Sequence, residues 1–311
     1  MAEPIHYIEH AAEVLAVAAR LICEKRRFVL VTAIEFKGGS SRECGTLALI
    51  DVQGAMFGYM SNGCIDRDIQ EHGKSALAAG EARVLHYGAG SPFLDLTLPC
   101  GGTLKLLLDP KPDNAEIRKA HAALSKRNSA TMSFLEPDSS QKHVFRYSPV
   151  PRIVLAGRGS VFRAMAKTAR MAGFDMVLMS PEEEDLHVLS RPSDFPSIHL
   201  QTPGAVPEIE LDEHSAFLTL FHDHDWEPAL IVKALDTRAR FIGCLGSKRT
   251  HEERCAILAG MGADEREIAR VSGPIGLVPS LRQAPLISVS ALAEVIEAFP
   301  AFIEQLQLSD A

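Results

Sequence analysis

The sequence lacks several features that mark whole classes of protein. Its six cysteines include no CxxC pair, which disfavours a zinc ribbon or a dense disulfide framework and makes reduced thiols the expectation. No apolar run approaches the ~20 residues needed to cross a bilayer. The net charge is −8 and Lys and Arg do not cluster, so we expect neither nucleic acid nor an anionic membrane as a partner.

What is present predicts a soluble protein of two domains. A length of 311 residues and an apolar content of 46% suffice for two ordinary cores. Near the N-terminus acids come early and apolar residues follow helical spacing, unlike the unbroken apolar core of a signal peptide; these residues are Ile5, Ile8, Ala12, Leu15 and Ala19. A cytoplasmic location is therefore expected.

The first part of the chain mixes strand and helix patterns. Short β-branched runs bounded by glycine turns predict strands over 28–35, 47–51, 55–60, 82–87 and 102–108. Helical spacing predicts helices over 65–80 and 115–126. The polar, turn-rich stretch that follows favours a boundary. We therefore predict an α+β domain over 1–135 and a linker over 136–150.

From Arg152 onward the pattern changes to strand, glycine turn, helix and strand. This is the opening βαβ unit of a Rossmann-like sheet. Later strands are predicted over 216–221 and 240–245, each followed by a polar loop and a helical stretch. The alternation predicts an α/β chain whose second domain, 151–311, has a parallel sheet.

The first glycine turn of that domain, Gly157-Arg158-Gly159, lies between a strand and a helix. Backbone amides at a helix N-terminus can hold a phosphate, and Arg158 adds positive charge. The GxGxxG pattern is incomplete, because Phe162 stands at the third glycine and Ser180 ends the second strand in place of an acid. Two interpretations stay open: a dinucleotide site or a purely structural turn.

A run of two histidines and two aspartates, His222-Asp223-His224-Asp225, follows the strand over 216–221. The carboxyl end of a strand is where open α/β sheets place their ligand crevice. Imidazoles and carboxylates there could hold a divalent metal or carry protons. The alternative is a hydrogen-bonded strand terminus without chemistry.

A second glycine loop, Gly246-Ser247-Lys248-Arg249-Thr250, also follows a predicted strand. Thr250 and Glu253 have capping-box spacing, which predicts that a helix begins there. Exposed amides and two cations then meet at one point, so this loop is the better candidate for an anion site. Lys248 and Arg249 could equally be ordinary solvated residues.

Two cysteines stand beside glycines at strand-to-turn junctions. These are Cys64 in SNGC and Cys100 in PCGG. A thiol in such a turn can be approached closely, and a helix that begins after Cys64 would lower the pKa of that thiol and favour thiolate. The alternative for each cysteine is a small buried apolar side chain.

Six short motifs in order resemble the XdhC/CoxI family of xanthine dehydrogenase accessory proteins. They are GGSSRECG (38–45), SNGCID (61–66), LPCGG (98–102), FHDH (221–224), GSKRTH (246–251) and GPIGL (273–277). The resemblance extends from about Phe28 to Glu297. It implies a chaperone that binds molybdenum cofactor, protects it while a cysteine desulfurase supports sulfuration, and delivers it to a molybdoenzyme of the xanthine dehydrogenase type. It also implies a homodimer and no turnover of a metabolite.

The resemblance also implies which residues contact the cofactor. Motif by motif, they are Arg42, Cys64, Cys100, Gly101, Gly102, Gly157, Gly159, His222, His224, Gly246, Ser247, Lys248 and Arg249. Soft thiolates suit molybdenum or sulfur, and basic glycine loops suit the phosphate of the pterin. Ser160 and Val278 depart from the family pattern, which is why nucleotide binding by the second domain is the less favoured expectation.

Three further hypotheses belong to other classes of protein. Gly157 and Gly159 on a βαβ unit would suit an NAD(P)-dependent oxidoreductase. His222, Asp223 and His224 would suit a metal-dependent hydrolase. A non-catalytic interaction module is the third. The chaperone hypothesis predicts that the cysteine turns and the basic loops line one cleft between the domains.

Overall fold

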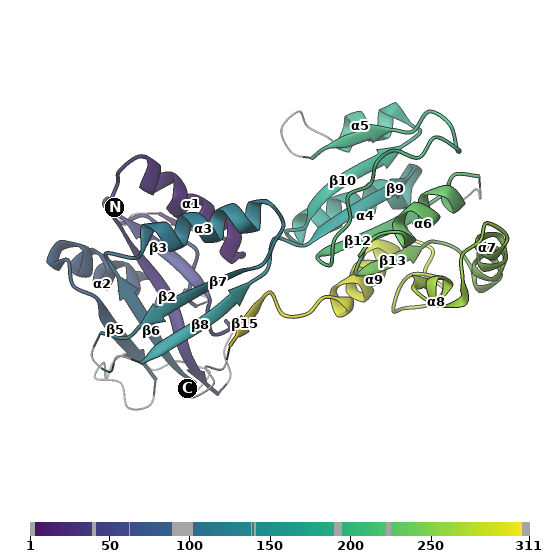
Figure 1. Cartoon of the computed structure of the whole chain (residues 1–311). Helices are drawn as coiled ribbons and strands as arrows, with labels where there is room; N and C mark the ends of the chain where they lie inside the picture. Colours follow the sequence, from purple (N-terminus) through teal and green to yellow (C-terminus); the bar gives the residue numbers. More distant parts are fainter. Residues whose placement is uncertain are drawn as a thin grey trace. The chain divides into compact units, whose positions relative to one another are not determined.

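A computed structural model of the chain divides it into two units (Figure 1). The structure describes residues 4–38, 42–61, 63–88, 102–137, 139, 141–189, 195–221 and 225–306. Residues 1–149 and 301–311 form the first unit, and residues 150–300 form the second. Each unit contains its own sheets and its own apolar core.

The first unit is built on a mixed sheet of six strands. Their order is β1 (Ile5–His6), β4 (Met56–Phe57), β3 (Leu47–Asp51), β2 (Phe28–Lys37), β6 (Thr103–Asp109) and β5 (Arg83–Tyr87). The long strand β2 is antiparallel to both β3 and β6, with a register shift between Ala33 and Glu35. The predicted strands are all present, and the turn at Gly54 joins β3 to β4 as expected.

Helices cover both faces of this sheet. On one face, α1 (Ala11–Cys23) and α3 (Asn114–Ser125) pack against Leu30 and other inward residues. On the other face, α2 (Asp66–Ala79) packs against Val29 and Val31. Successive residues of a strand point to opposite faces, so the apolar run of β2 is explained by burial on both sides.

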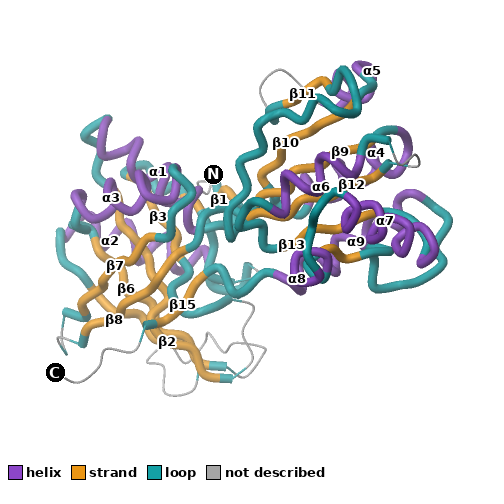
Figure 2. Tube along the Cα trace, turned by 45° about the vertical axis from the view of Figure 1, so that its right-hand side comes forward, coloured by secondary structure: helices purple, strands orange, loops and turns teal. Residues whose placement is uncertain are grey.

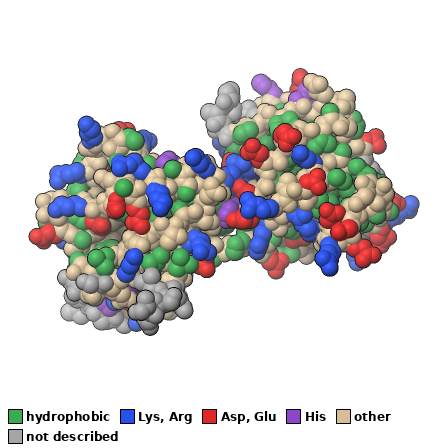
Figure 3. Space-filling model, viewed as in Figure 1, with side chains coloured by type: hydrophobic (Ala, Val, Ile, Leu, Met, Phe, Trp, Pro, Cys, Tyr) green, Lys and Arg blue, Asp and Glu red, His purple; other side chains and the backbone are tan. Residues whose placement is uncertain are grey.

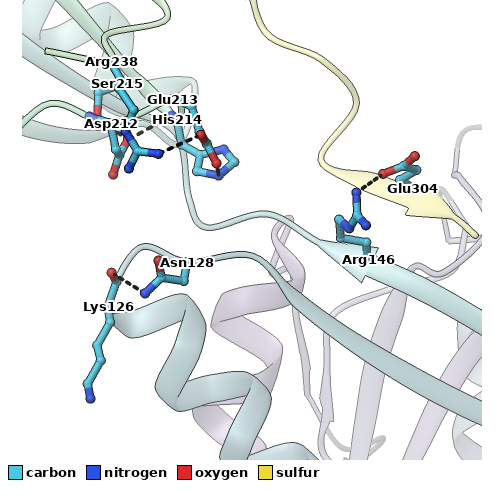
Figure 4. Close-up of polar contacts among 9 residues, drawn as sticks. All are labelled: Lys126, Asn128, Arg146, Asp212, Glu213, His214, Ser215, Arg238 and Glu304. Atoms are coloured by element: carbon cyan, nitrogen blue, oxygen red, sulfur yellow. Dashed lines mark hydrogen bonds and ion pairs between the residues drawn. The ribbon is translucent and has the colours of Figure 1, made fainter.

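A second, three-stranded sheet lies where the linker was predicted. It contains β7 (Ala130–Leu135), β8 (Lys142–Tyr147) and β15 (Ile303–Gln305). Arg146 pairs with Glu304 at 3.1 Å and fastens β15 to β8 (Figure 4). The stretch 136–150 is therefore a hairpin and not a linker, and residues 301–311 group with the first unit and not with 151–300.

The polar residues that suggested a linker are partners of one another. Glu136 accepts a hydrogen bond from the Ser139 hydroxyl at 2.9 Å and contacts His143 Nε2 at 2.8 Å. Burial raises the pKa of Glu136, but the hydrogen bonds from His143 and Ser139 outweigh it and leave the pKa below its usual value. Both Glu136 and His143 are buried, which a polar composition does not reveal.

The second unit contains a parallel sheet of six strands. Their order is β11 (Ser197–His199), β10 (Asp175–Ser180), β9 (Arg152–Gly157), β12 (Ser215–Leu220), β13 (Phe241–Cys244) and β14 (Val271–Ser272). In order of appearance this is 3-2-1-4-5-6, the Rossmann arrangement. The order reverses between β9 and β12, where Gly157 pairs with Leu220. The predicted fold class is confirmed.

Helices cover both faces of this sheet too (Figure 2). One face carries α4 (Gly159–Met171), α5 (Glu183–Leu189) and α9 (Ala284–Ala298). The other carries α6 (Glu227–Leu235), α7 (Lys248–Gly260) and α8 (Glu265–Ile268). The turn before β12 is closed by the Ser215 hydroxyl, which donates to Asp212 at 2.6 Å (Figure 4).

The surface carries charges of both signs. In Figure 3, Lys and Arg side chains alternate with Asp and Glu over the visible face of each unit. Among the described residues, no helix is long and apolar enough to cross a membrane.

Candidate functional site

The turn that carries Cys64 is organised by one buried carboxylate. Asp66, the first residue of α2, accepts hydrogen bonds from the amides of Met60 at 2.8 Å, Ser61 at 3.1 Å and Gly63 at 3.0 Å. It also accepts one from the Ser61 hydroxyl at 2.8 Å. Gly63 has a φ of 95°, so the turn needs a residue without a Cβ there. The result is a fixed loop that leaves the Cys64 thiol exposed.

Arg42 lies against the chain that leads into this turn. Its guanidinium stacks on the Tyr59 ring, 3.4 Å from the ring centre, and its Nε donates to the Tyr59 carbonyl at 3.2 Å. Its Nη1 pairs with Glu9 at 3.0 Å. Burial and the hydrogen bond to Glu9 raise the pKa of the Tyr59 hydroxyl. The structure thus places two of the predicted residues, Arg42 and Cys64, around the segment 59–66.

The third motif of the first unit is described only in part. Cys100 and Gly101 lie outside the described residues, whereas Gly102 is buried next to the start of β6. Gly88, at the end of β5, has a φ of 94°, and a Cβ there would meet the Gly102 carbonyl at 2.2 Å. Gly88 and Gly102 therefore lie close together, which leaves no room for a larger side chain at Gly88.

Two other cysteines, Cys244 and Cys44, are less exposed than Cys64. Cys244 is fully buried at the end of β13, and burial raises its pKa to about 12. Cys44 is half-buried, and burial raises its pKa as well. A thiol with a raised pKa forms little thiolate, which is the form that binds metals. Among these three cysteines, Cys64 is therefore the accessible thiol.

The first glycine turn of the second unit already holds an acid from its own chain. The Gly159 amide, at the N-terminus of α4, donates to Asp185 Oδ2 at 2.7 Å. Arg163 also pairs with Asp185, and Arg158 pairs with Glu182 at 3.4 Å. The pyrophosphate of a dinucleotide occupies this position in Rossmann sites. Asp185, from α5, takes the place of that anion.

We expect no binding of NADH or NADPH at this turn. A dinucleotide would have to displace Asp185, which is buried and paired with Arg163. Fluorescence titration to about 1 mM, the weak end of useful cofactor affinity, should give no saturation. Saturable binding in the micromolar range would contradict this account of the turn.

The histidine motif cannot be assigned a geometry. His222, Asp223 and His224 lie outside the described residues. The strand that precedes them in the chain, β12, lies beside the reversal of strand order. Within the described ranges, no group of three or more His, Cys, Asp or Glu side chains could hold a metal ion.

The second glycine loop leads into α7, but not through the predicted capping box. Ser247 is the N-cap, and its hydroxyl accepts from the Thr250 amide at 3.1 Å. Glu253 instead pairs with Arg249 at 2.9 Å, one turn away on the same exposed face. The prediction that Thr250 caps the helix was wrong by three residues. The hydroxyl of Ser247, three positions earlier in the chain, is the capping group.

Sequence reasoning missed a buried ion pair beneath this loop. Arg254 donates to Glu227 Oε2 through Nε at 3.1 Å and through Nη2 at 2.9 Å, and both side chains are almost fully buried. Arg254 Nη2 also donates to the Leu245 carbonyl at 2.7 Å. The pair ties α6 and α7 to the end of β13. Its two members lie 27 positions apart, so no local motif marks them.

A cavity of about 400 Å³ adjoins the second glycine loop. One wall contains Gly246, Ser247 and Lys248, and the opposite wall contains Gly276 and neighbours from the GPIGL segment. Two of the motifs noted in the sequence therefore line one cavity. The volume falls within the range of small-molecule sites.

The described site residues thus form two groups, one in each unit. In the first unit Arg42 contacts Tyr59, just before the turn of Cys64, and in the second unit Gly246, Ser247 and Lys248 line the cavity. Arg249 lies on the exposed side of α7, with its side chain 87% exposed and paired with Glu253. Gly157 and Gly159 form the turn occupied by Asp185.

The fold and these residues define a chain with a mixed-sheet N-terminal unit and a Rossmann-type second unit. A family profile described as the XdhC Rossmann domain matches residues 153–295. A second, described as the XdhC and CoxI family, matches residues 21–88. The chain belongs to the XdhC/CoxI family, as the motifs predicted.

Individual relatives match over most of this chain. The molybdenum cofactor insertion chaperone PaoD of Escherichia coli (strain K12) is 25% identical over 297 residues, covering 91% of this chain and 86% of PaoD. The uncharacterized protein YqeB of the same organism is 23% identical over 281 residues, covering 90% of this chain but only 45% of YqeB. A crystal structure described as a xanthine dehydrogenase from Bacillus halodurans has a TM-score of 0.74 at 19% identity, covering 93% of this chain and 96% of that one. That structure establishes the fold alone.

Proposed function

We propose that the chain is an accessory chaperone that binds molybdenum cofactor as cargo and delivers it to a molybdoenzyme of the xanthine dehydrogenase type. The observation that carries the proposal is the exposed Cys64 on a turn held by the buried Asp66, with Arg42 bound to Tyr59 just before that turn. The distant relationship to PaoD, named as a molybdenum cofactor insertion chaperone, supports it.

The chemistry of this turn suits such a cargo. A thiolate is a soft ligand of the kind that molybdenum and sulfur centres accept. The guanidinium of Arg42 pairs with Glu9 and donates to the Tyr59 carbonyl, so it orders the chain that leads into the same turn. Because Asp66 accepts from the amides of Met60 and Gly63, the backbone that leads into Cys64 is held in place before the cargo arrives.

The finer part of the proposal concerns partners. We propose that a cysteine desulfurase supports sulfuration of the bound cofactor before delivery, and that the chain acts as a homodimer in the cytoplasm. Cys100 is the second thiol proposed to contact the cargo. His222 and His224 are further proposed contacts of the cargo.

Cysteine variants test the assigned contacts. Cys64→Ala and Cys100→Ala are each expected to lower the molybdopterin content of the purified protein by about tenfold, since each removes a soft ligand. The content is measured by fluorescence after oxidation. Cys23→Ala is the matched control, because Cys23 is also exposed but ends α1 away from the motifs. Wild-type content in both single variants would overturn the assigned role of the cysteines.

A further inference from the structure

The cavity beside α7 has one charged lining residue among those the structure describes. Lys248 is exposed, makes no ion pair with any described residue, and is the only Lys, Arg, Asp or Glu of that lining. The first backbone amides of α7 lie on the same wall, and they add positive potential. A ligand with a negative charge at this end of the cavity is therefore favoured.

The rest of the lining is mainly apolar. Pro274, Ile275, Pro279, Leu281 and Ile287 form most of the wall away from Lys248. The polar contribution to the rest of the lining comes from Ser280, Ser290 and the backbone around Gly276. A heterocyclic ring has apolar faces and a few polar edges, so it matches such a wall better than an extended polar chain does.

The cavity is formed before any ligand binds. Glu294 of α9 accepts hydrogen bonds from the Ser272 hydroxyl and the Gly276 amide. The Val278 amide donates to the Ser290 hydroxyl at 2.7 Å. On the opposite wall, Arg254 holds the Leu245 carbonyl. A preformed site loses little conformational entropy on binding.

We propose that this cavity binds a phosphate monoester of a heterocycle, with the phosphate at Lys248 and the ring against the 274–287 wall. The site then lies at the β13 end of the Rossmann sheet, and not at the β9 turn that Asp185 occupies. Two sources share this chemistry: the pterin phosphate of the cargo, which rests on the proposed function, and a free mononucleotide, which does not.

The test uses the full-length chain and two probes that differ only in the phosphate. GMP is expected to bind at least tenfold more tightly than guanosine in calorimetric titrations. Lys248→Glu should weaken GMP binding by tenfold or more and leave guanosine unchanged, because it reverses the one lining charge. Lys167→Glu, an exposed lysine of α4, is the matched control and should bind GMP within twofold of the wild type.

The molybdopterin content of Lys248→Glu identifies the source. Loss of molybdopterin indicates the cargo, whereas retained molybdopterin with lost GMP binding indicates a free mononucleotide. A Lys248→Glu variant that retains molybdopterin and binds GMP as the wild type does, or a wild type that binds no GMP while this variant retains molybdopterin, would overturn the proposal. Failure of the proposed function gives a different result. The wild type would then accept no molybdopterin, and the GMP titrations alone would test the cavity.

Discussion

Replacement of Arg254 by methionine is expected to lower the free energy of unfolding of the second unit by about 3–5 kcal/mol. The change leaves Glu227 buried without the guanidinium of Arg254, while the Thr219 hydroxyl still donates to it at 3.0 Å. It also frees the Leu245 carbonyl at the end of β13. Amide hydrogen exchange of β12 and β13 in the full chain measures the loss where it arises.

Two further variants separate the buried charge from general damage. Arg249→Met changes the same residue type on the same helix, but its side chain is 87% exposed, so the stability should stay close to that of the wild type. Glu227→Gln added to Arg254→Met should recover part of the stability, because the unpaired charge is removed. An Arg254→Met protein as stable as Arg249→Met would contradict the account.

Replacement of Asp66 by asparagine is expected to cost the first unit about 2–4 kcal/mol and to lower its molybdopterin content. The carboxylate accepts from three amides and the Ser61 hydroxyl. The side-chain nitrogen of asparagine is a donor. Some of the groups that now donate to Asp66 would therefore face another donor and lose their hydrogen bond. The Cys64 turn then loses its fixed shape. Exchange at the amides of Met60 and Gly63 measures the local effect.

The same substitution elsewhere in the unit provides the control. Asp113 caps α3 by accepting from the amides of Ala115 and Glu116, and it is exposed. Asparagine is an equally good N-cap, so Asp113→Asn should change stability by less than about 0.5 kcal/mol and leave molybdopterin content unchanged. Equal effects of the two substitutions would show that Asp66 has no special role at the Cys64 turn.

Much of the fold could be predicted because its signals are local. The run over β2 and the strand, glycine turn and helix after Arg152 are continuous patterns, and they set both sheets. The hairpin of β7 and β8 was missed, since Glu136 and His143 are polar residues that become buried by pairing. The strand β15 joins that hairpin across more than 150 positions, and sequence spacing carries no trace of such contacts.

The candidate site shows the same division. The exposed turn of Cys64 and the loop before α7 follow from glycines and strand ends, which the sequence displays. The side chains that hold these loops cannot be read from the sequence pattern. Asp185 of α5 accepts from the Gly159 amide of α4, and Arg254 of α7 pairs with Glu227 of α6. These side chains act through tertiary contacts, so only the folded chain reveals that the first glycine turn is occupied and the second adjoins a cavity.

The central claim is that this chain carries molybdenum cofactor. The most direct measurement is the molybdopterin content of the wild-type protein after incubation with the cofactor and removal of the excess, read by fluorescence after oxidation. We predict roughly one molybdopterin per chain, as expected when one preformed site is saturated well above its dissociation constant. A content no higher than that of an unrelated control protein treated in the same way would contradict the claim.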